Sequence, residues 1–299
     1  MTLWNNNQPL IGYSARAEHA LYDLLPAKDV IPNHLHEAMH YAVFNGGKRL
    51  RPLLVYTTGV MLKVPFTVLD RIGASIEFAH CYSLVHDDLP SMDNADLRRG
   101  KPSTHKAYNE ETAILVGDAL QTLAFETLAT IPTTDLSPAQ SLEITRILAK
   151  SIGSRGMAGG QMLDLLYAEK VMTKAFLTEL HEMKTGKLLQ SCIEMTIVAA
   201  GIQDEVIKKN LIDASKKLGL AFQVQDDLLD KTSSTAQLGK PQGLDKQANK
   251  STFATVMPLA QATALVESLY QSVITNVQAL KCEDTDFCTL IDGMAKRQH

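Results

Sequence analysis

A helical spacing of apolar residues that continues along nearly the whole chain constrains the fold more than any other feature. Apolar side chains recur every three or four positions, for example through residues 66–88, and this is the spacing of one helix face. The strict alternation that marks a half-buried strand is missing from the sequence. We therefore predict an all-α protein, one large helical bundle of about ten helices that forms a single domain over residues 1–299.

Prolines, glycines and two long polar stretches divide this pattern into separate helices. Ser137 and Pro138 form an N-cap followed by a proline, which predicts a helix start. Other helices are predicted at residues 34–45, 66–88, 110–130, 157–170, 173–200 and 204–230, with two more near the end of the chain. The polar stretches 89–104 and 231–251 are predicted to be loops, and the second is expected to act as a lid that becomes ordered over a bound ligand.

Composition excludes several classes of protein. A chain of 299 residues, 45% hydrophobic and 21% charged, is neither disordered nor fibrous. Its net charge of −4 argues against general nucleic-acid binding, which needs a basic surface. The four cysteines are scattered and form no CxxC pair, as is usual in a reducing compartment. We see no signal peptide and no apolar run long enough to cross a bilayer, so we expect a cytoplasmic protein without a membrane span.

Two clusters of aspartates carry the first chemical signal. One cluster closes the helix 66–88 and the other closes the helix 204–230; their members are Asp87, Asp88, Asp93, Asp226, Asp227 and Asp230. Like charges at the C-terminal end of a helix repel one another and oppose the helix dipole, so a cation should compensate them. Oxygen ligands without cysteine suit a hard cation, and Mg²⁺ fits best. A single cluster would be an ordinary solvated helix end, but two of them before long polar loops predict a metal site.

Basic residues lie near both clusters in the sequence. Lys48, Arg49 and Arg51 follow the pair Gly46-Gly47, and Arg98 and Arg99 follow the first cluster. Lys184 lies in the helix 173–200, and Lys240 and Lys250 lie in the second polar loop. Basic segments beside carboxylate clusters indicate a polyphosphate that is held by Mg²⁺ on one side and by Arg or Lys on the other.

The motifs that contain these residues match one known family in order. They read GGKRLRP, HCYSLVHDDLPSMDNADLRRGKP, GDAL, GGQMLD, KTG and FQVQDDLLD, within residues 37–253. The chain resembles the trans-isoprenyl diphosphate synthases, most closely the bacterial type that makes farnesyl diphosphate (geranyltranstransferases). The resemblance implies a helical bundle around a central cavity, a homodimer, and Mg²⁺-dependent condensation of dimethylallyl or geranyl diphosphate with isopentenyl diphosphate.

The resemblance also implies residue roles. The two aspartate clusters would bind three Mg²⁺ ions on the allylic diphosphate. The residues that would grip that diphosphate are Arg98, Lys184, Lys240 and Lys250. The residues that would hold the diphosphate of isopentenyl diphosphate are Lys48, Arg51, His80 and Arg99. Catalytic positions beside the reacting carbons would be Lys184, Thr185 and Gln223.

Tyr82 carries our prediction of product length. It precedes Asp87 by five residues, which is about 7.5 Å along a helix. A prenyl tail whose diphosphate is fixed at Asp87 would point toward Tyr82, whose ring would stop growth at fifteen carbons. Ser83 is small and leaves room for the earlier product. In the bacterial farnesyl synthases that the chain resembles, the same position is aromatic.

Three alternatives remain at this point. The first is a geranylgeranyl or longer-chain synthase with the same machinery. The second is a metal phosphohydrolase of the HD type, which would use His86 and Asp87, although the second cluster contains no histidine. The third is a non-catalytic binding subunit, against which both intact clusters argue.

Overall fold

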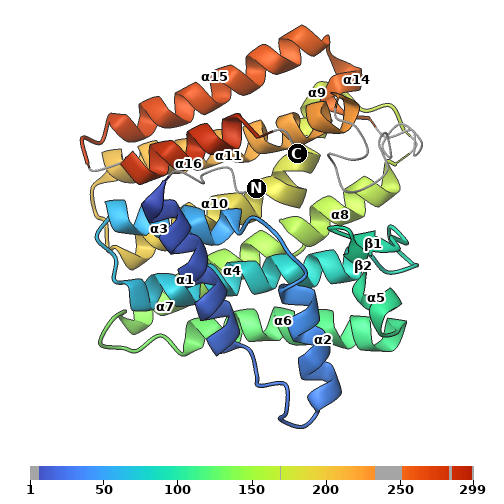
Figure 1. The fold of residues 1–299 in the computed structure, drawn as a ribbon. Helices are drawn as coiled ribbons and strands as arrows, with labels where there is room; N and C mark the ends of the chain where they lie inside the picture. Colours follow the sequence, from blue (N-terminus) through green and yellow to red (C-terminus); the bar gives the residue numbers. More distant parts are fainter. Residues whose placement is uncertain (1–6, 169, 233–250, 283–284, 298–299) are drawn as a thin grey trace.

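The computed structural model describes residues 7–168, 170–232, 251–282 and 285–297, and it confirms the all-α bundle (Figure 1). The helices are α1 (Gln8–Leu24), α2 (Asn33–Val43), α3 (Leu50–Met61), α4 (Phe66–Asp87), α5 (Thr104–Ala107), α6 (Glu110–Ala129), α7 (Pro138–Ile152), α8 (Met157–Leu166), α9 (Lys174–His181), α10 (Lys187–Ala199), α11 (Glu205–Thr232), α14 (Phe253–Val256), α15 (Leu259–Gln278) and α16 (Thr285–Ala295). No helix in these ranges is both long and apolar enough to cross a membrane.

Helix α4 lies at the centre because it is apolar on nearly all sides. Its side chains are buried almost without a break from Val68 to Val85, and it packs against α1, α3, α6 and α10. One hydrophobic core extends from Leu10 in α1 to Met294 in α16. The C-terminal end of α4 therefore projects from a rigid core.

Local signals set several helix ends as predicted. The Ser137 side chain accepts a hydrogen bond from the Gln140 amide, the Gln140 side chain accepts one from the Ser137 amide, and Pro138 is the first residue of α7. The helix predicted at 157–170 is shorter in the structure, because α8 ends at Leu166.

The predicted loop 89–104 contains a small hairpin that the sequence pattern did not reveal. Strand β1 (Leu97–Arg98) pairs antiparallel with β2 (Lys101–Pro102). The turn residues Arg99 and Gly100 both have positive φ, 54° and 78°, as in the type I′ turn that joins two-residue hairpins. Arginine is not a usual residue at this turn position, which is why the pattern was missed.

The helix predicted at 173–200 is interrupted. Between α9 and α10 lies one π-helical turn, η1 (Glu182–Gly186). Two glycines let neighbouring helices approach it. A Cβ on Gly160 of α8 would overlap the Lys184 backbone, and one on Gly219 of α11 would come within 2.9 Å of the Gly186 Cα. Such turns within helices often occur at functional sites.

The end of α4, the hairpin, α8 and the end of α11 all lie on the right-hand side of Figure 1. The fold thus brings both predicted aspartate clusters to the same end of the bundle.

Candidate active site

A cavity of about 350 Å³ opens at this end of the bundle, and its lining is mostly apolar. It brings together seven of the residues predicted from the sequence: Arg51, His80, Tyr82, Ser83, Asp87, Lys184 and Thr185. Helix α8 supplies apolar side chains to the opposite wall, among them Met157, Met162 and Leu165. A cavity of this kind can accept a hydrocarbon chain that carries a charged group at one end.

Asp87 is the carboxylate of the first cluster that lines the cavity. Burial raises its pKa to about 6, and the carboxylates of Asp93 and Asp88 act in the same direction, whereas Lys184 and Arg98 oppose them. The Asp93 amide donates to the Asp87 carbonyl over 2.9 Å, which folds the chain back beside the helix end. The Asp93 side chain is exposed. The raised pKa shows that an ionised Asp87 still lacks full cationic compensation.

Asp88 has a different environment from that of Asp87. Its side chain is buried and receives a forked set of hydrogen bonds from Arg98, with Nε 3.1 and 3.2 Å from the two carboxylate oxygens and Nη2 as a further donor. Arg98 belongs to β1, so the hairpin is fixed to the end of α4 through this ion pair. In this arrangement Asp88 orients Arg98.

In the second cluster too, the middle carboxylate is buried and bonded to the protein. Asp227 is buried and accepts a 2.7 Å hydrogen bond from the Phe253 amide and a 3.3 Å bond from Gln223 Nε2. His181 Nε2 lies 3.3 Å from Asp227 Oδ2, the oxygen that also accepts the Phe253 amide. Asp227 therefore joins α11 to α9 and α14, and it places Gln223 beside the cluster.

Asp226 is more exposed and pairs with a residue that we did not single out in the sequence. Arg297 Nη2 lies 2.6 Å from Asp226 Oδ1, and the guanidinium stacks 3.8 Å from the centre of the Phe222 ring. Burial lowers the pKa of Lys48, and nearby Arg297 acts in the same direction while Asp226 opposes it. Lys48 is thus close to the second cluster. Only the basic character of the chain end could have pointed to Arg297.

Lys184 lies between two carboxylates. Its Nζ forms a 2.8 Å ion pair with Asp164 of α8, and its charge acts on Asp87. Gln161, one turn before Asp164, lines the same cavity, and neither atom of its buried amide has a hydrogen-bond partner in the described part of the chain. Since a buried amide without partners is costly, Gln161 indicates a polar ligand or water in the cavity.

Two of the cations predicted for the second diphosphate, Arg51 and Arg99, lie near His80. Burial lowers the pKa of His80 well below its ordinary value, and Arg51 and Arg99 act in the same direction. Arg51 Nε is buried without a hydrogen-bond partner among the described residues. The imidazole is kept neutral mainly by burial and further by the nearby guanidiniums, whose mutual repulsion an anion would relieve.

Tyr82 lines the cavity from α4 and is 7% exposed. Its ring meets His86 edge-on at 6.0 Å, and its hydroxyl is hydrogen-bonded to Gln121 of α6. The ring is held in place between two neighbours and narrows the cavity.

Some predicted features lie outside the described residues. These are Lys240, Lys250 and almost all of the predicted lid at 231–251. Among the residues that are described, no group of three histidine, cysteine or acidic side chains is gathered as a ready metal cage.

Comparisons with known proteins agree with this geometry. The family model described as polyprenyl synthetase matches residues 32–284. The farnesyl diphosphate synthase of Haemophilus influenzae is 42% identical over 250 residues, which are 83% of this chain and 84% of that protein.

Solved structures share the whole fold. A geranyltransferase from Legionella pneumophila superposes with a TM-score of 0.88 at 40% identity, covering 99% of this chain and 98% of that one. A geranyltransferase from Helicobacter pylori, complexed with magnesium and isoprenyl diphosphate, gives 0.82 at 35% identity over 97% of each chain. This chain belongs to the polyprenyl synthetase family.

Proposed function

We propose that the chain is a farnesyl diphosphate synthase, which condenses isopentenyl diphosphate with dimethylallyl or geranyl diphosphate. The composition of the cavity wall carries this proposal. An apolar space is bordered by the carboxylate Asp87 and by the cations Lys184 and Arg51. Few substrates other than a lipid diphosphate need all three in one cavity. The similarity to the Haemophilus influenzae farnesyl diphosphate synthase supports this choice of substrate.

The donor set fits Mg²⁺ as the cofactor. Asp87 and Asp226 offer carboxylate oxygens, and the described residues form no protein-only cage. Mg²⁺ commonly takes one or two carboxylates and completes its shell with water and substrate phosphates. We propose three ions between the two clusters and the allylic diphosphate. When bound, they would neutralise the charge that grows on the leaving diphosphate.

The chain's own cations divide between the two substrates in this proposal. Arg98 and Lys184 bind the allylic diphosphate, together with Lys240 and Lys250, which the structure does not describe. The isopentenyl diphosphate is bound by Lys48, Arg51, His80 and Arg99. Thr185 and Gln223 point oxygen dipoles toward the allylic carbons, and the apolar wall keeps water away from them.

The reaction balances without a dedicated protein base. The allylic C1–O bond breaks and diphosphate leaves with the electron pair. The double bond of isopentenyl diphosphate attacks C1, and a proton then leaves the new carbon chain. The released diphosphate is the expected proton acceptor, as the family resemblance implies.

Product length in this proposal is set by Tyr82. We expect Tyr82→Ala to release products of twenty or more carbons, because the ring narrows the cavity along the direction of the tail. The matched control Tyr82→Phe keeps the ring and should still stop at fifteen carbons. Chromatography of the dephosphorylated products distinguishes them, and an active Tyr82→Ala enzyme that still makes only farnesyl diphosphate would place the limit elsewhere.

The environment of His86 argues against the phosphohydrolase alternative. His86 Nε2 lies 3.1 Å from the Ile114 carbonyl of α6, and a Cβ on Gly117 would overlap the imidazole ring. The ring is therefore packed against α6 rather than joined with Asp87 as a metal-binding pair.

The deciding assay supplies isopentenyl diphosphate with dimethylallyl or geranyl diphosphate and Mg²⁺. We expect farnesyl diphosphate from either starter and no turnover in EDTA. Release of phosphate or diphosphate without carbon–carbon bond formation would favour a hydrolase. Products longer than fifteen carbons would favour the longer-chain synthase.

We also propose that the enzyme works as a cytoplasmic homodimer. Ile114 and Leu115 of α6 and Leu142 of α7 are exposed apolar side chains on two helices that pack together. A second copy of the chain would cover them. Sedimentation analysis should give a dimer that Leu115→Glu weakens, and an unchanged mass for that variant would argue against this face.

A further inference from the structure

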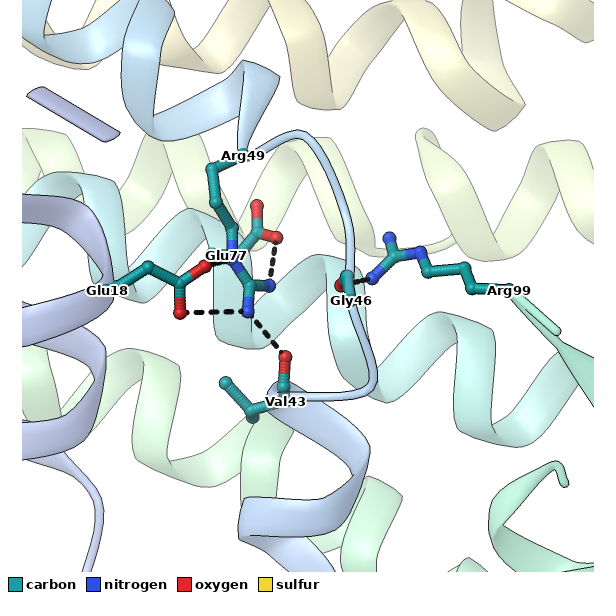
Figure 2. Close-up of polar contacts among 6 residues, drawn as sticks. All are labelled: Glu18, Val43, Gly46, Arg49, Glu77 and Arg99. Carbon is teal, nitrogen blue, oxygen red and sulfur yellow. Dashed lines mark hydrogen bonds and ion pairs between the residues drawn. The ribbon is translucent and has the colours of Figure 1, made fainter. Parts of the chain in front are cut away.

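Arg49 lies between two residues assigned to the isopentenyl diphosphate, yet it does not line the cavity. Its side chain is 1% exposed and points into the core (Figure 2). Nε donates to Glu18 of α1 over 2.7 Å, Nη1 donates to Glu77 of α4 over 2.9 Å, and Nη2 donates to the Val43 carbonyl over 2.7 Å. The three nitrogens thus reach three different segments of the chain.

Glu77 is the costly member of this network. Its side chain is 2% exposed in the middle of α4, among buried apolar side chains. A carboxylate in such a place must be paired, and replacing a buried ion pair by apolar side chains is often neutral or stabilising. The pair of Glu77 with Arg49 is therefore better explained by the geometry it fixes than by stability alone.

The pair of Arg49 with Glu77 fixes the loop between α2 and α3, residues 44–49. Arg49 has a left-handed backbone, φ 51°, and immediately precedes α3. Its bond to the Val43 carbonyl closes the base of the loop, because Val43 is the last residue of α2. Gly46 and Gly47, with φ of 95° and 124°, make the turn between these points.

The far side of the loop is fixed by Arg99. Its Nη1 donates to the Gly46 carbonyl (Figure 2), and a Cβ on Gly47 would lie 2.5 Å from that nitrogen. Lys48 is carried on this loop, and Arg51 follows in the first turn of α3. Cations that are brought together in this way repel one another until an anion binds, so the loop needs anchors.

We propose that Arg49, Glu77 and Glu18 form a positioning network, which holds the loop 44–49 so that Lys48, Arg51 and Arg99 converge on one diphosphate. This inference rests on the proposed function, because it takes these cations to bind isopentenyl diphosphate. Arg49 and Glu77 act through the loop and touch no substrate. The network makes affinity for this diphosphate depend on a buried ion pair between the loop 44–49 and α4.

A second ion pair in the same part of the molecule supplies the control. Arg16 of α1 forms two 2.7 Å hydrogen bonds with Asp70 of α4, which also accepts one from the Tyr56 hydroxyl. Both pairs link α1 to the core, but the hydrogen bonds of Asp70 go to Arg16 and Tyr56, which lie outside the loop. Asp70→Asn therefore reports what a weakened attachment of α1 does by itself.

The test compares Glu77→Gln, Glu18→Gln and Asp70→Asn in steady-state kinetics. We expect Glu77→Gln to raise the KM for isopentenyl diphosphate about 10- to 100-fold, because a misplaced binding group loses about that much. The KM for geranyl diphosphate should change less, since the Arg98 guanidinium and Lys184 pair with Asp88 and Asp164 rather than with the network. The loop reaches Arg98 through a 3.4 Å hydrogen bond from Asn45 Nδ2 to the Arg98 carbonyl. Glu18→Gln should show the same selectivity with a smaller rise, because Glu18 is 43% exposed. Asp70→Asn should leave both KM values unchanged.

Hydrogen–deuterium exchange gives a readout that does not depend on turnover. We expect faster exchange of the amides of residues 44–49 in Glu77→Gln, while Asp70→Asn leaves them as in the unmodified protein. Arg49→Lys, which keeps the charge but cannot reach all three partners, should behave like Glu77→Gln. If Glu77→Gln unfolds the protein, Glu18→Gln and Arg49→Lys test in its place whether the network holds the loop.

Several results would overturn the network. These are equal rises in both KM values, unchanged values with unchanged exchange in the loop, or the same effects from Asp70→Asn. If the unmodified protein forms no farnesyl diphosphate, the proposed function fails, and the exchange data still decide whether the network holds the loop.

Discussion

Both aspartate clusters place several carboxylates close together at the end of a helix. The residues that bind these carboxylates lie at very different distances along the chain in the two clusters. In each cluster the middle carboxylate is buried and bonded to the protein. Asp88 is held by Arg98, ten residues later. Asp227 is held by the Phe253 amide, 26 residues later. Asp226, next to it, pairs with Arg297, close to the chain's end.

This difference shows which parts of the site are local. In the first cluster, Asp88 is paired by the hairpin that directly follows α4, and Asp87 also faces the charge of Lys184 from the π-helical turn. The second cluster is completed only when α14 and Arg297, two residues beyond α16, return to α11. We therefore expect the second cluster to depend on the packing of the last third of the chain and the first to be independent of it.

The largest effect on turnover should come from replacing Asp87 or Asp226, the first carboxylate of each cluster. Asp87→Ala and Asp226→Ala should each lower kcat by about 10²–10³-fold or more, which is the typical loss for one preorganised group that stabilises the transition state. Equal losses would show that the two clusters act on one reaction centre. Near-normal turnover of either variant would contradict the equivalent roles that we assign to Asp87 and Asp226.

A smaller effect should separate the two middle carboxylates in stability. Asp227→Ala leaves the Phe253 amide buried without its acceptor, which should lower the free energy of unfolding by about 1–3 kcal/mol. Asp88→Ala should cost less than about 1 kcal/mol, because Arg98 is 31% exposed and can turn to water. Urea unfolding at constant pH measures both, and the reverse order would contradict the assignment of local and distant partners.

The sequence could predict the parts of the site that depend on neighbouring residues, but not those that depend on residues distant along the chain. Most helix spans and the Ser137 cap depend on neighbouring residues, so they were predicted close to where the structure has them, whereas the roles of the aspartates stay a prediction. The contact of Arg297 with Asp226 depends on the tertiary return of α16, and no local pattern encodes it. The π-helical turn at Lys184 likewise depends on the close approach of Gly160 and Gly219 from other helices.

The basic segment 48–51 illustrates the limit most clearly. In the sequence, Lys48, Arg49 and Arg51 form one cationic group. In the structure, Arg49 itself has a left-handed backbone conformation, and its side chain points into the core, toward Glu77 of α4. The signal that was available is Glu77 itself, since a glutamate in the middle of an apolar helix requires a buried partner.

The smallest effect concerns pH and applies to the metal-free protein. The pKa of Asp87 is raised from 3.8 to about 6, mainly by burial, so the folded protein binds this proton more tightly than the unfolded chain. Its contribution to stability therefore rises as the pH falls through 6 toward 4. Asp87→Asn removes the buried charge and should stabilise the protein in EDTA at pH 7.5 by about 1–2 kcal/mol.

Thermal unfolding of that variant against the unmodified protein, at several pH values, checks this expectation. The difference in stability should shrink as the pH is lowered to about 4, where both side chains are neutral. Asp93→Asn should give a smaller gain, because its side chain is exposed and its charge only adds to the repulsion at Asp87. A variant that is less stable at pH 7.5 in EDTA would show that the Asp87 charge is already compensated.

The division of labour within the clusters is tested most directly by a crystal structure with Mn²⁺ and a non-reactive allylic thiodiphosphate. Anomalous scattering locates the metal ions without reference to activity. We expect Mn²⁺ bound by Asp87 and by Asp226, on one diphosphate, with Asp88 still on Arg98 and Asp227 still on the Phe253 amide. Metal ions at one cluster alone, or bound by Asp88 or Asp227 after those bonds have broken, would contradict the account.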